Sequence, residues 1–210
     1  MNLVKIFNQL YQRYGPQGWW PVTNNPVGNK HCNPLFEICV GAILTQNTAW
    51  TNVEKAIKCL LEKNLMSPKA IATCRMAKLQ KCVHSSGYYK QKTKKLKIFA
   101  AWLVKNYQGD LRLFFKKPLV SAREELLSLW GIGHETADSI LLYAGKKTIF
   151  VIDAYTKRLC RRYGVNFKTY DEYQKFFEKK LCDGISGWTK TKLYNEYHAL
   201  IVRCGKSTSS

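Results

Sequence analysis

The stretch LWGIGHETAD, from Leu129 to Asp138, is followed directly by SILLYAGKKTIFVIDAYTKRL, which ends at Leu159. Two glycines flank one isoleucine, a run with helical spacing follows, and Asp153 stands at the end of an apolar segment. Because glycine adopts positive φ without a Cβ penalty, a short turn containing glycine lets two helices approach closely. The stretch therefore predicts two helices joined by a tight hairpin.

The predicted hairpin offers an anion site made of main chain. The backbone N–H groups of Gly131, Gly133 and the first turn of the next helix lack intrahelical partners, and the helix dipole adds to them. Such a site binds DNA phosphate without reading sequence. An ordinary helix C-cap followed by a tight turn accounts equally well for these residues, since a single G-x-G is a weak motif.

The charge of the chain favours the phosphate interpretation. The 210 residues contain 34 Lys and Arg against 14 Asp and Glu, a net charge of +20. Such an excess indicates a polyanionic partner, with nucleic acid the first candidate and an anionic membrane surface the second. No apolar run approaches the ~20 residues that span a bilayer. We therefore expect a nucleic-acid partner and no membrane.

Helix signals cover most of the chain, and strand signals are almost absent. Asn33-Pro34 and Ser67-Pro68 have the residue types that start helices. We infer an all-α protein with one lobe within residues 33–117 and a second lobe formed by residues 1–32 and 118–210. The expected helices cover residues 3–14, a segment from 33, 52–63, a segment from 67, 88–107, 121–129, 134–144, 153–163, 170–181 and 188–204.

The cysteines indicate a reducing environment. None of the eight cysteines pairs with another at C-x-x-C spacing, so the sequence contains neither a zinc ribbon nor a redox dithiol. The N-terminal segment has helical spacing rather than the pattern of an export signal. We therefore expect a cytoplasmic protein whose cysteines serve as small buried apolar residues. They are Cys32, Cys39, Cys59, Cys74, Cys82, Cys160, Cys182 and Cys204.

Three ordered segments resemble the endonuclease III superfamily of DNA glycosylases. Residues 129–159 are similar to its helix-hairpin-helix and Gly/Pro–Asp signature. Residues 33–57, NPLFEICVGAILTQNTAWTNVEKAI, resemble its early helix, loop and helix, and residues 84–100, HSSGYYKQKTKKLKIFA, resemble its Gly-φ-φ-x-x-Lys segment. The resemblance implies two helical lobes flanking a DNA-binding cleft. It also implies a monomeric enzyme that acts on double-stranded DNA containing damaged bases.

The resemblance gives Asp153 the catalytic role in cleavage of the glycosidic bond. Departure of the base leaves an oxocarbenium-like sugar, and a nearby carboxylate stabilises that charge or orients water. A helix dipole would keep this aspartate ionised. The ordinary alternative is a helix N-cap, which is the commoner use of Asp at such a position.

The resemblance also implies a set of DNA-binding residues around the hairpin. Gln46 would fill the gap that a flipped nucleotide leaves, although a loop amide that caps a helix is the alternative. The complete expected set is Gln46, Gly131, Ile132, Gly133, His134 and Thr136.

Glu135 departs from the pattern of bifunctional relatives, which carry a lysine there that forms a Schiff base. A carboxylate cannot form an imine, His134 is no substitute, and Lys146 and Lys147 lie a full helix away. We therefore expect water as the nucleophile and no efficient strand cleavage. A preference for acids in a first helical turn also explains Glu135.

Many relatives bind a [4Fe–4S] cluster through cysteines spaced C-x6-C-x2-C-x5-C near the C-terminus. Here the tail offers only Cys182 and Cys204, and the x6 gap between Cys32 and Cys39 lies at the wrong end of the chain. A cluster needs a fixed number of thiolates. We expect no iron–sulfur cluster, no other metal and no cofactor.

The segment GWWP resembles the alkylpurine branch of the superfamily, the endonuclease III-like 3-methyladenine DNA glycosylases. Electron-rich aromatic faces suit a positively charged methylpurine, whereas packing is the ordinary role of large aromatic residues. The main hypothesis is a monofunctional glycosylase for alkylated purines. The alternatives are a glycosylase/lyase for oxidised pyrimidines and a non-catalytic helix-hairpin-helix DNA-binding protein. The expected base pocket contains Trp19, Trp20, Pro21, Phe36 and Glu135.

Overall fold

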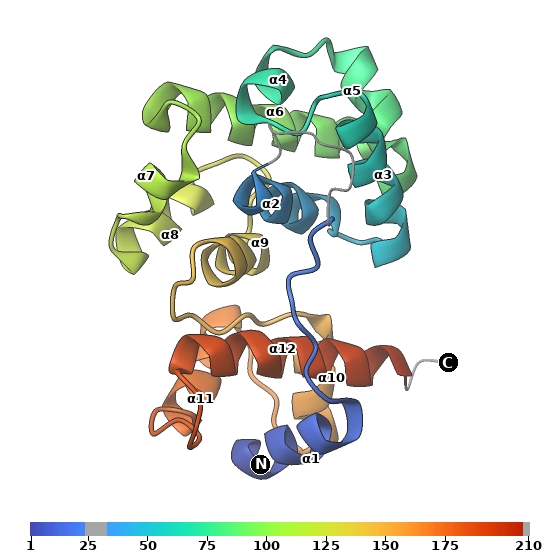
Figure 1. Cartoon of the computed structure of the whole chain (residues 1–210). Coiled ribbons are helices and arrows are strands. Elements are labelled where there is room, and N and C mark those ends of the chain that lie inside the picture. Colours follow the sequence, from blue (N-terminus) through green and yellow to red (C-terminus); the bar gives the residue numbers. More distant parts are fainter. Residues whose placement is uncertain (24–32, 208–210) are drawn as a thin grey trace. The chain divides into compact units, whose positions relative to one another are not determined.

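The computed structural model describes residues 1–23 and 33–207 (Figure 1). Throughout this part of the chain the ordered elements are helices, and no strand is assigned, so the all-α prediction is confirmed. No helix among these residues is both long enough and apolar enough to cross a membrane.

The first compact unit, which we call the terminal unit, comprises Met1–Trp20 and Leu141–Ser210. In it α12 packs against α1 and α10, and the hydroxyl of Tyr197 donates to the Leu3 carbonyl at 2.9 Å. Its elements are α1 (Leu3–Tyr14), the π-helical turn η2 (Ile140–Ala144), which begins at the boundary, α10 (Ala154–Arg162), α11 (Tyr170–Lys180) and α12 (Lys190–Ser207).

The second compact unit, the central unit, comprises Pro21–Ile140. The long helix α6 packs against α2, α4 and α5. Its elements are α2 (Pro34–Leu44), α3 (Trp50–Glu62), α4 (Pro68–Thr73), α5 (Met76–Val83), the 3-10 turn η1 (His84–Ser86), α6 (Tyr89–Tyr107), α7 (Leu111–Phe115), α8 (Leu119–Leu127) and α9 (His134–Ser139).

This division differs from the predicted lobes, because residues 118–140 group with the middle of the chain rather than with its ends. The physical reason is packing: α8 contacts α9, and α9 in turn contacts α2. The hairpin thus belongs to the central unit, whereas Asp153 belongs to the terminal unit.

The helix starts expected from local capping are confirmed. The Asn33 side chain accepts the Leu35 N–H at 2.9 Å, and the Ser67 hydroxyl accepts the Ala70 N–H at 3.2 Å. The helices α5 and α7 lie where no helix was expected. Both are short, and α5 begins after Arg75 without a side-chain cap.

One lysine of α6 is part of the core of the central unit. Lys92, the lysine of the Gly-φ-φ-x-x-Lys segment, donates to the carbonyls of Leu44 at 2.8 Å and Ser86 at 2.5 Å. Burial, aided by the charge of Lys95, lowers the pKa of Lys92 to about 8. Its ammonium thereby connects α6 to the C-terminal ends of α2 and η1.

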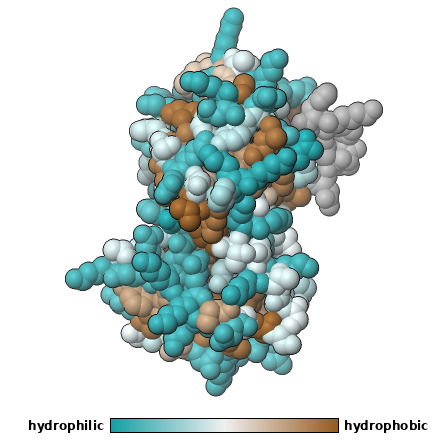
Figure 2. Space-filling model, turned by 90° about the vertical axis from the view of Figure 1, so that its left-hand side faces the viewer, coloured by the Kyte–Doolittle hydropathy of each residue, from teal (hydrophilic) through white to brown (hydrophobic). Residues whose placement is uncertain are grey.

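The surface agrees with the charge of the chain. Hydrophilic residues cover most of the face shown in Figure 2, and hydrophobic residues are exposed there only in small areas. Of the predicted buried cysteines, Cys39, Cys82 and Cys160 are buried and Cys182 is exposed, which contradicts the expectation for Cys182. Cys32 lies outside the described residues.

Candidate active site

The hairpin between α8 and α9 uses its two glycines differently. Gly131 has φ of +84°, and a Cβ at this position would lie 2.6–2.9 Å from carbon atoms of the Lys95 side chain. Gly133 has φ of −97°, serves as the N-cap of α9 and has open space where a Cβ would lie. Only Gly131 therefore needs to be glycine, for its backbone conformation and for the close approach of Lys95.

Gln46 connects the loop after α2 to this hairpin. Its Nε2 donates to Thr136 Oγ1 at 2.8 Å and to the Gly131 carbonyl at 3.3 Å, and its Oε1 accepts from Lys95 Nζ. Burial lowers the pKa of Lys95. The structure thus brings three of the predicted DNA-binding residues together and adds Lys95, which the sequence did not indicate.

Two more predicted DNA-binding residues have structural contacts. The Ile132 side chain is buried, and its N–H donates to the Leu129 carbonyl at 3.1 Å. His134 is exposed, with Nδ1 2.9 Å from Nη2 of Arg123, and Arg123 also pairs with the buried Asp138 at 2.7 Å. These contacts fix the start of α9 against α8.

Asp153 combines a capping role with burial. It is the N-cap of α10, and its Oδ1 accepts the Thr156 N–H at 2.7 Å. The residue is only 7% exposed. Burial raises the pKa of Asp153, but His198 and Thr156 outweigh it, and the pKa lies below its usual value. The carboxylate is therefore ionised although it is buried.

A histidine that the sequence did not indicate lies beside this carboxylate. His198 of α12 places Nε2 3.7 Å from Asp153 Oδ2, and its Nδ1 is 2.5 Å from the hydroxyl of Tyr143. The contact with Asp153 is longer than a hydrogen bond but within ion-pair distance. No local motif could have revealed it, because 45 residues (198 − 153) separate the two side chains.

The two tryptophans of the GWWP segment lie against the same tyrosine. The Trp19 ring is 6.1 Å and the Trp20 ring 5.0 Å from the Tyr143 ring, and Trp19 also meets the His198 ring at 6.2 Å. Both tryptophans are half-buried. Tyr143 thus contacts both rings, and the base-pocket role of the two tryptophans stays a prediction.

Comparison with known proteins identifies the family that combines this hairpin with such an aspartate. Residues 40–182, more than half of the chain, match the family described as HhH-GPD superfamily base excision DNA repair protein. The chain belongs to the HhH-GPD superfamily.

Two sequences and one solved structure define its place in more detail. The chain is 43% identical over 204 residues to "Putative DNA repair glycosylase MJ1434" of Methanocaldococcus jannaschii, covering 95% of this chain and 85% of that protein. It is 29% identical over 163 residues to Endonuclease III of Thermotoga maritima, covering 77% and 72%. It is similar to H. pylori 3-methyladenine DNA glycosylase (MagIII) bound to 1,N6-ethenoadenine, with TM-score 0.84, 30% identity and 99% of both chains covered. This HhH-GPD protein is therefore a base excision repair DNA glycosylase.

The remaining residues of the expected base pocket lie in the central unit. Phe36 is 1% exposed and stacks on Phe99 with ring centroids 6.2 Å apart. This contact is core packing, the ordinary role of a large aromatic residue and the alternative to a base-pocket role. Pro21 is exposed. Glu135 is exposed in the first turn of α9, where the helix dipole favours an acid. The pocket roles of these three residues stay predictions.

Within the described residues of this HhH-GPD chain, no group of three or more His, Cys, Asp or Glu side chains could hold a metal ion. In the terminal unit Cys160 is buried, Cys182 exposed and Cys204 half-buried. The expectation of a cluster-free protein stays a prediction.

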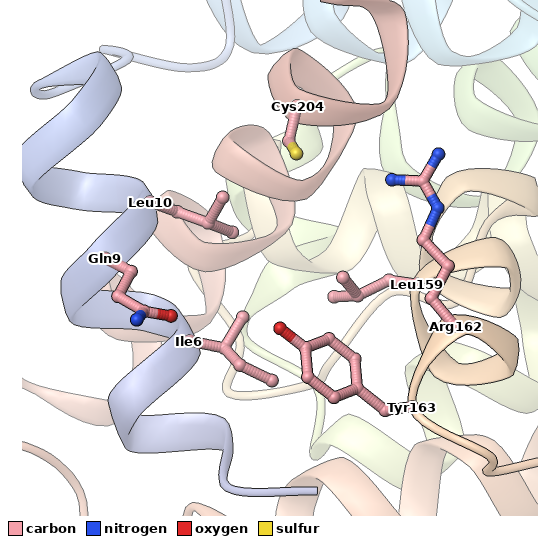
Figure 3. A pocket seen from close by; sticks show the side chains of 7 residues that line it. All are labelled: Ile6, Gln9, Leu10, Leu159, Arg162, Tyr163 and Cys204. Atoms are coloured by element: carbon pink, nitrogen blue, oxygen red, sulfur yellow. The ribbon is translucent and has the colours of Figure 1, made fainter. Parts of the chain in front are cut away.

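A separate pocket of about 340 Å³ lies between α1, α10 and α12 (Figure 3). It is at the C-terminal end of α10, whereas Asp153 caps the N-terminal end, and no predicted site residue lines it. We therefore do not assign it to the glycosylase chemistry. Its lining consists of Ile6, Gln9, Leu10, Leu159, Arg162, Tyr163 and Cys204.

Proposed function

We propose that this DNA glycosylase is monofunctional and hydrolyses the N-glycosidic bond of alkylated purines such as 3-methyladenine. The observation that carries the proposal is the ionised, buried carboxylate of Asp153 in the same unit as the Trp19 and Trp20 rings. A fixed anion stabilises the positive charge that develops on the sugar as the base leaves. Aromatic faces attract a flat, positively charged base.

Three features support the individual parts of the proposal. A relative at 30% identity is named a 3-methyladenine DNA glycosylase, which favours alkylated purines. The main-chain hairpin and the net charge of +20 suit contacts with DNA phosphate. Glu135, in place of a lysine, favours water as the nucleophile, because a carboxylate cannot form an imine.

In this mechanism Asp153 remains ionised while the C1′–N bond breaks and its electron pair leaves with the base. A water molecule then forms a bond to C1′ of the oxocarbenium-like sugar and releases one proton to solvent. A methylated purine already carries positive charge, so its departure as a neutral base needs no strong acid from the protein. The hairpin would hold the phosphate backbone in register, and Gln46 would occupy the gap beside the flipped nucleotide.

The test uses duplexes that each carry one lesion: 3-methyladenine, 7-methylguanine, 1,N6-ethenoadenine or an oxidised pyrimidine. We expect release of methylated purines and abasic strands that break only after alkali treatment. Excision confined to oxidised pyrimidines would contradict the substrate, and strand breaks without alkali would contradict the monofunctional assignment.

Borohydride trapping tests the nucleophile directly. Wild type and Glu135→Gln should form no covalent complex with DNA, whereas Glu135→Lys should gain one because it introduces an amine at that position. A complex with wild-type protein would instead indicate another lysine, and the lysines with lowered pKa, Lys92, Lys95 and Lys146, would be the first to substitute.

A further inference from the structure

The buried imidazole of His198 contacts two groups through its two ring nitrogens. The residue is 4% exposed, with Nδ1 2.5 Å from the Tyr143 hydroxyl and Nε2 3.7 Å from Asp153 Oδ2. Within the described chain, His198 Nε2 and Thr156 Oγ1 are buried without a hydrogen-bond partner, and both act on the Asp153 carboxylate. Native proteins bury few unsatisfied polar atoms, so two beside one carboxylate need an explanation.

The surroundings of the imidazole select one tautomer. Burial raises the pKa of Tyr143 well above its ordinary value, and the charges of Asp153 and Glu196 raise it further, so the hydroxyl keeps its proton. That hydroxyl can donate to Nδ1, which leaves the proton of a neutral ring on Nε2. An N–H on Nε2 then points toward the Asp153 carboxylate.

This arrangement fixes both oxygens of the carboxylate. Oδ1 is held by the Thr156 N–H at 2.7 Å, and Oδ2 faces His198. A cap bond to one oxygen alone leaves the other oxygen without a defined partner. The second contact sets the plane of the carboxylate and favours its charged form.

The same imidazole lies next to the tryptophans. The His198 ring meets the edge of Trp19 at 6.2 Å, and the GWW segment is fixed to α12 because Glu196 Oε1 accepts the Gln17 N–H at 2.6 Å. His198 and Glu196 both belong to α12. One helix thus holds both the catalytic carboxylate and the aromatic segment.

We propose that His198 is a positioning residue for Asp153 and that Tyr143 fixes its tautomer. The proposal rests on the glycosylase function proposed above. His198 keeps its Nε2 proton throughout the reaction and does not touch the substrate. It orients Oδ2 and keeps the carboxylate ionised, so its contribution reaches the reaction only through Asp153.

The first test compares three variants by single-turnover excision of 3-methyladenine. His198→Phe keeps a ring against Trp19 but removes both nitrogens, and we expect the rate to fall about 10-fold, because Asp153 Oδ2 loses its partner at ion-pair distance and one pKa unit or its equivalent of carboxylate stabilisation corresponds to about a factor of ten. His198→Gln retains an N–H that can face Asp153 and should recover most of that loss. His84→Phe, the same change at an exposed histidine of the central unit, is the matched control and should excise normally.

The pH profile separates positioning from packing. Without His198, burial of Asp153 is opposed by fewer partners, so its pKa rises and the acid limb of the rate profile moves to higher pH. The other titratable groups of this cluster are Tyr143 on η2, which stays neutral, and Glu196 on α12, which titrates in wild type and variant alike. A packing defect would lower the melting temperature without moving the acid limb.

A measurement on the DNA-free protein keeps the two proposals distinguishable. In ¹⁵N-histidine NMR spectra, His198 should be protonated at Nε2, and Asp153→Asn should shift that signal. If wild type excises no lesion but this signal behaves as expected, the proposed function is wrong and the contact stands. If wild type excises while His198→Phe retains its full rate and acid limb, the positioning role is wrong. Should His198→Phe not fold, Tyr143→Phe must change the tautomer and lower the rate, and failure of either overturns the proposal.

Discussion

Substitution of Asp153 by Asn separates the capping role of this residue from its proposed catalytic role. Asparagine is as good an N-cap as aspartate, so the bond to the Thr156 N–H, 2.7 Å long in the structure, should survive. The amide carries no charge, so the substitution leaves no buried carboxylate to be paired. We therefore expect a change in unfolding free energy of about 1 kcal/mol or less.

The effect on excision should be far larger. Asparagine removes the negative charge that stabilises the oxocarbenium-like sugar, and loss of one preorganised electrostatic group costs about 10²–10³-fold in rate. Asp153→Ala should lose the same catalysis and also the cap, which contributes about 0.5–2 kcal/mol. For a chain of this size each kcal/mol lowers the melting temperature by about 2–4 °C.

The assay measures single-turnover excision at saturating protein, together with calorimetric melting and DNA affinity on the same samples. The expected pattern is an inactive Asp153→Asn with near-native melting and affinity, and an inactive Asp153→Ala that melts earlier. Excision by Asp153→Asn at the wild-type rate would refute the reasoning and leave Asp153 only a helix cap.

Three further predictions concern the hairpin, the core and the metal. Gly131→Ala should destabilise the protein by about 1–2 kcal/mol, since a Cβ there meets the Lys95 side chain at positive φ. Gly133→Ala should cost less, because φ is negative and the space is open, so that only the weaker N-cap preference of alanine counts; equal melting of the two variants would contradict this. Phe36→Ala should cost about 3–5 kcal/mol in urea unfolding because its ring is packed on Phe99; a loss of activity with unchanged stability would assign the ring to the base pocket instead. Purified protein should lack the visible absorbance of thiolate-bound iron and excise equally well after chelation, and a chelator-sensitive enzyme would disprove the expectation.

The sequence predicted the features that depend on neighbouring residues. Asn33, Ser67 and Asp153 start helices as expected because an N-cap bonds to an N–H two or three residues later. The hairpin was also predicted from neighbouring residues, its two glycines, although only Gly131 has a positive φ. These helices and the hairpin could be predicted because N-cap bonds and helical spacing involve residues within one or two helical turns of each other.

The features that the sequence did not reveal depend on packing between distant segments. Lys95 reaches Gln46 across 49 residues, and His198 reaches Tyr143 across 55. On sequence alone both are ordinary polar residues of long helices. The same limit explains the lobe boundary, since residues 118–140 join the central unit through contacts between helices.

Capping alone does not account for the environment of Asp153. Asparagine, serine or threonine would cap α10 without burying a charge. An aspartate exposed to water would also cap it, with no desolvation cost. Here the carboxylate is 7% exposed, and burial opposes its ionisation. The neighbouring His198 Nε2 and Thr156 Oγ1 are buried, and within the described residues neither has a partner at hydrogen-bond distance, although both act on this carboxylate. A cluster that keeps one carboxylate charged, oriented and dry is what electrostatic stabilisation of a cationic sugar requires, because a fixed anion acts most strongly where water does not screen it.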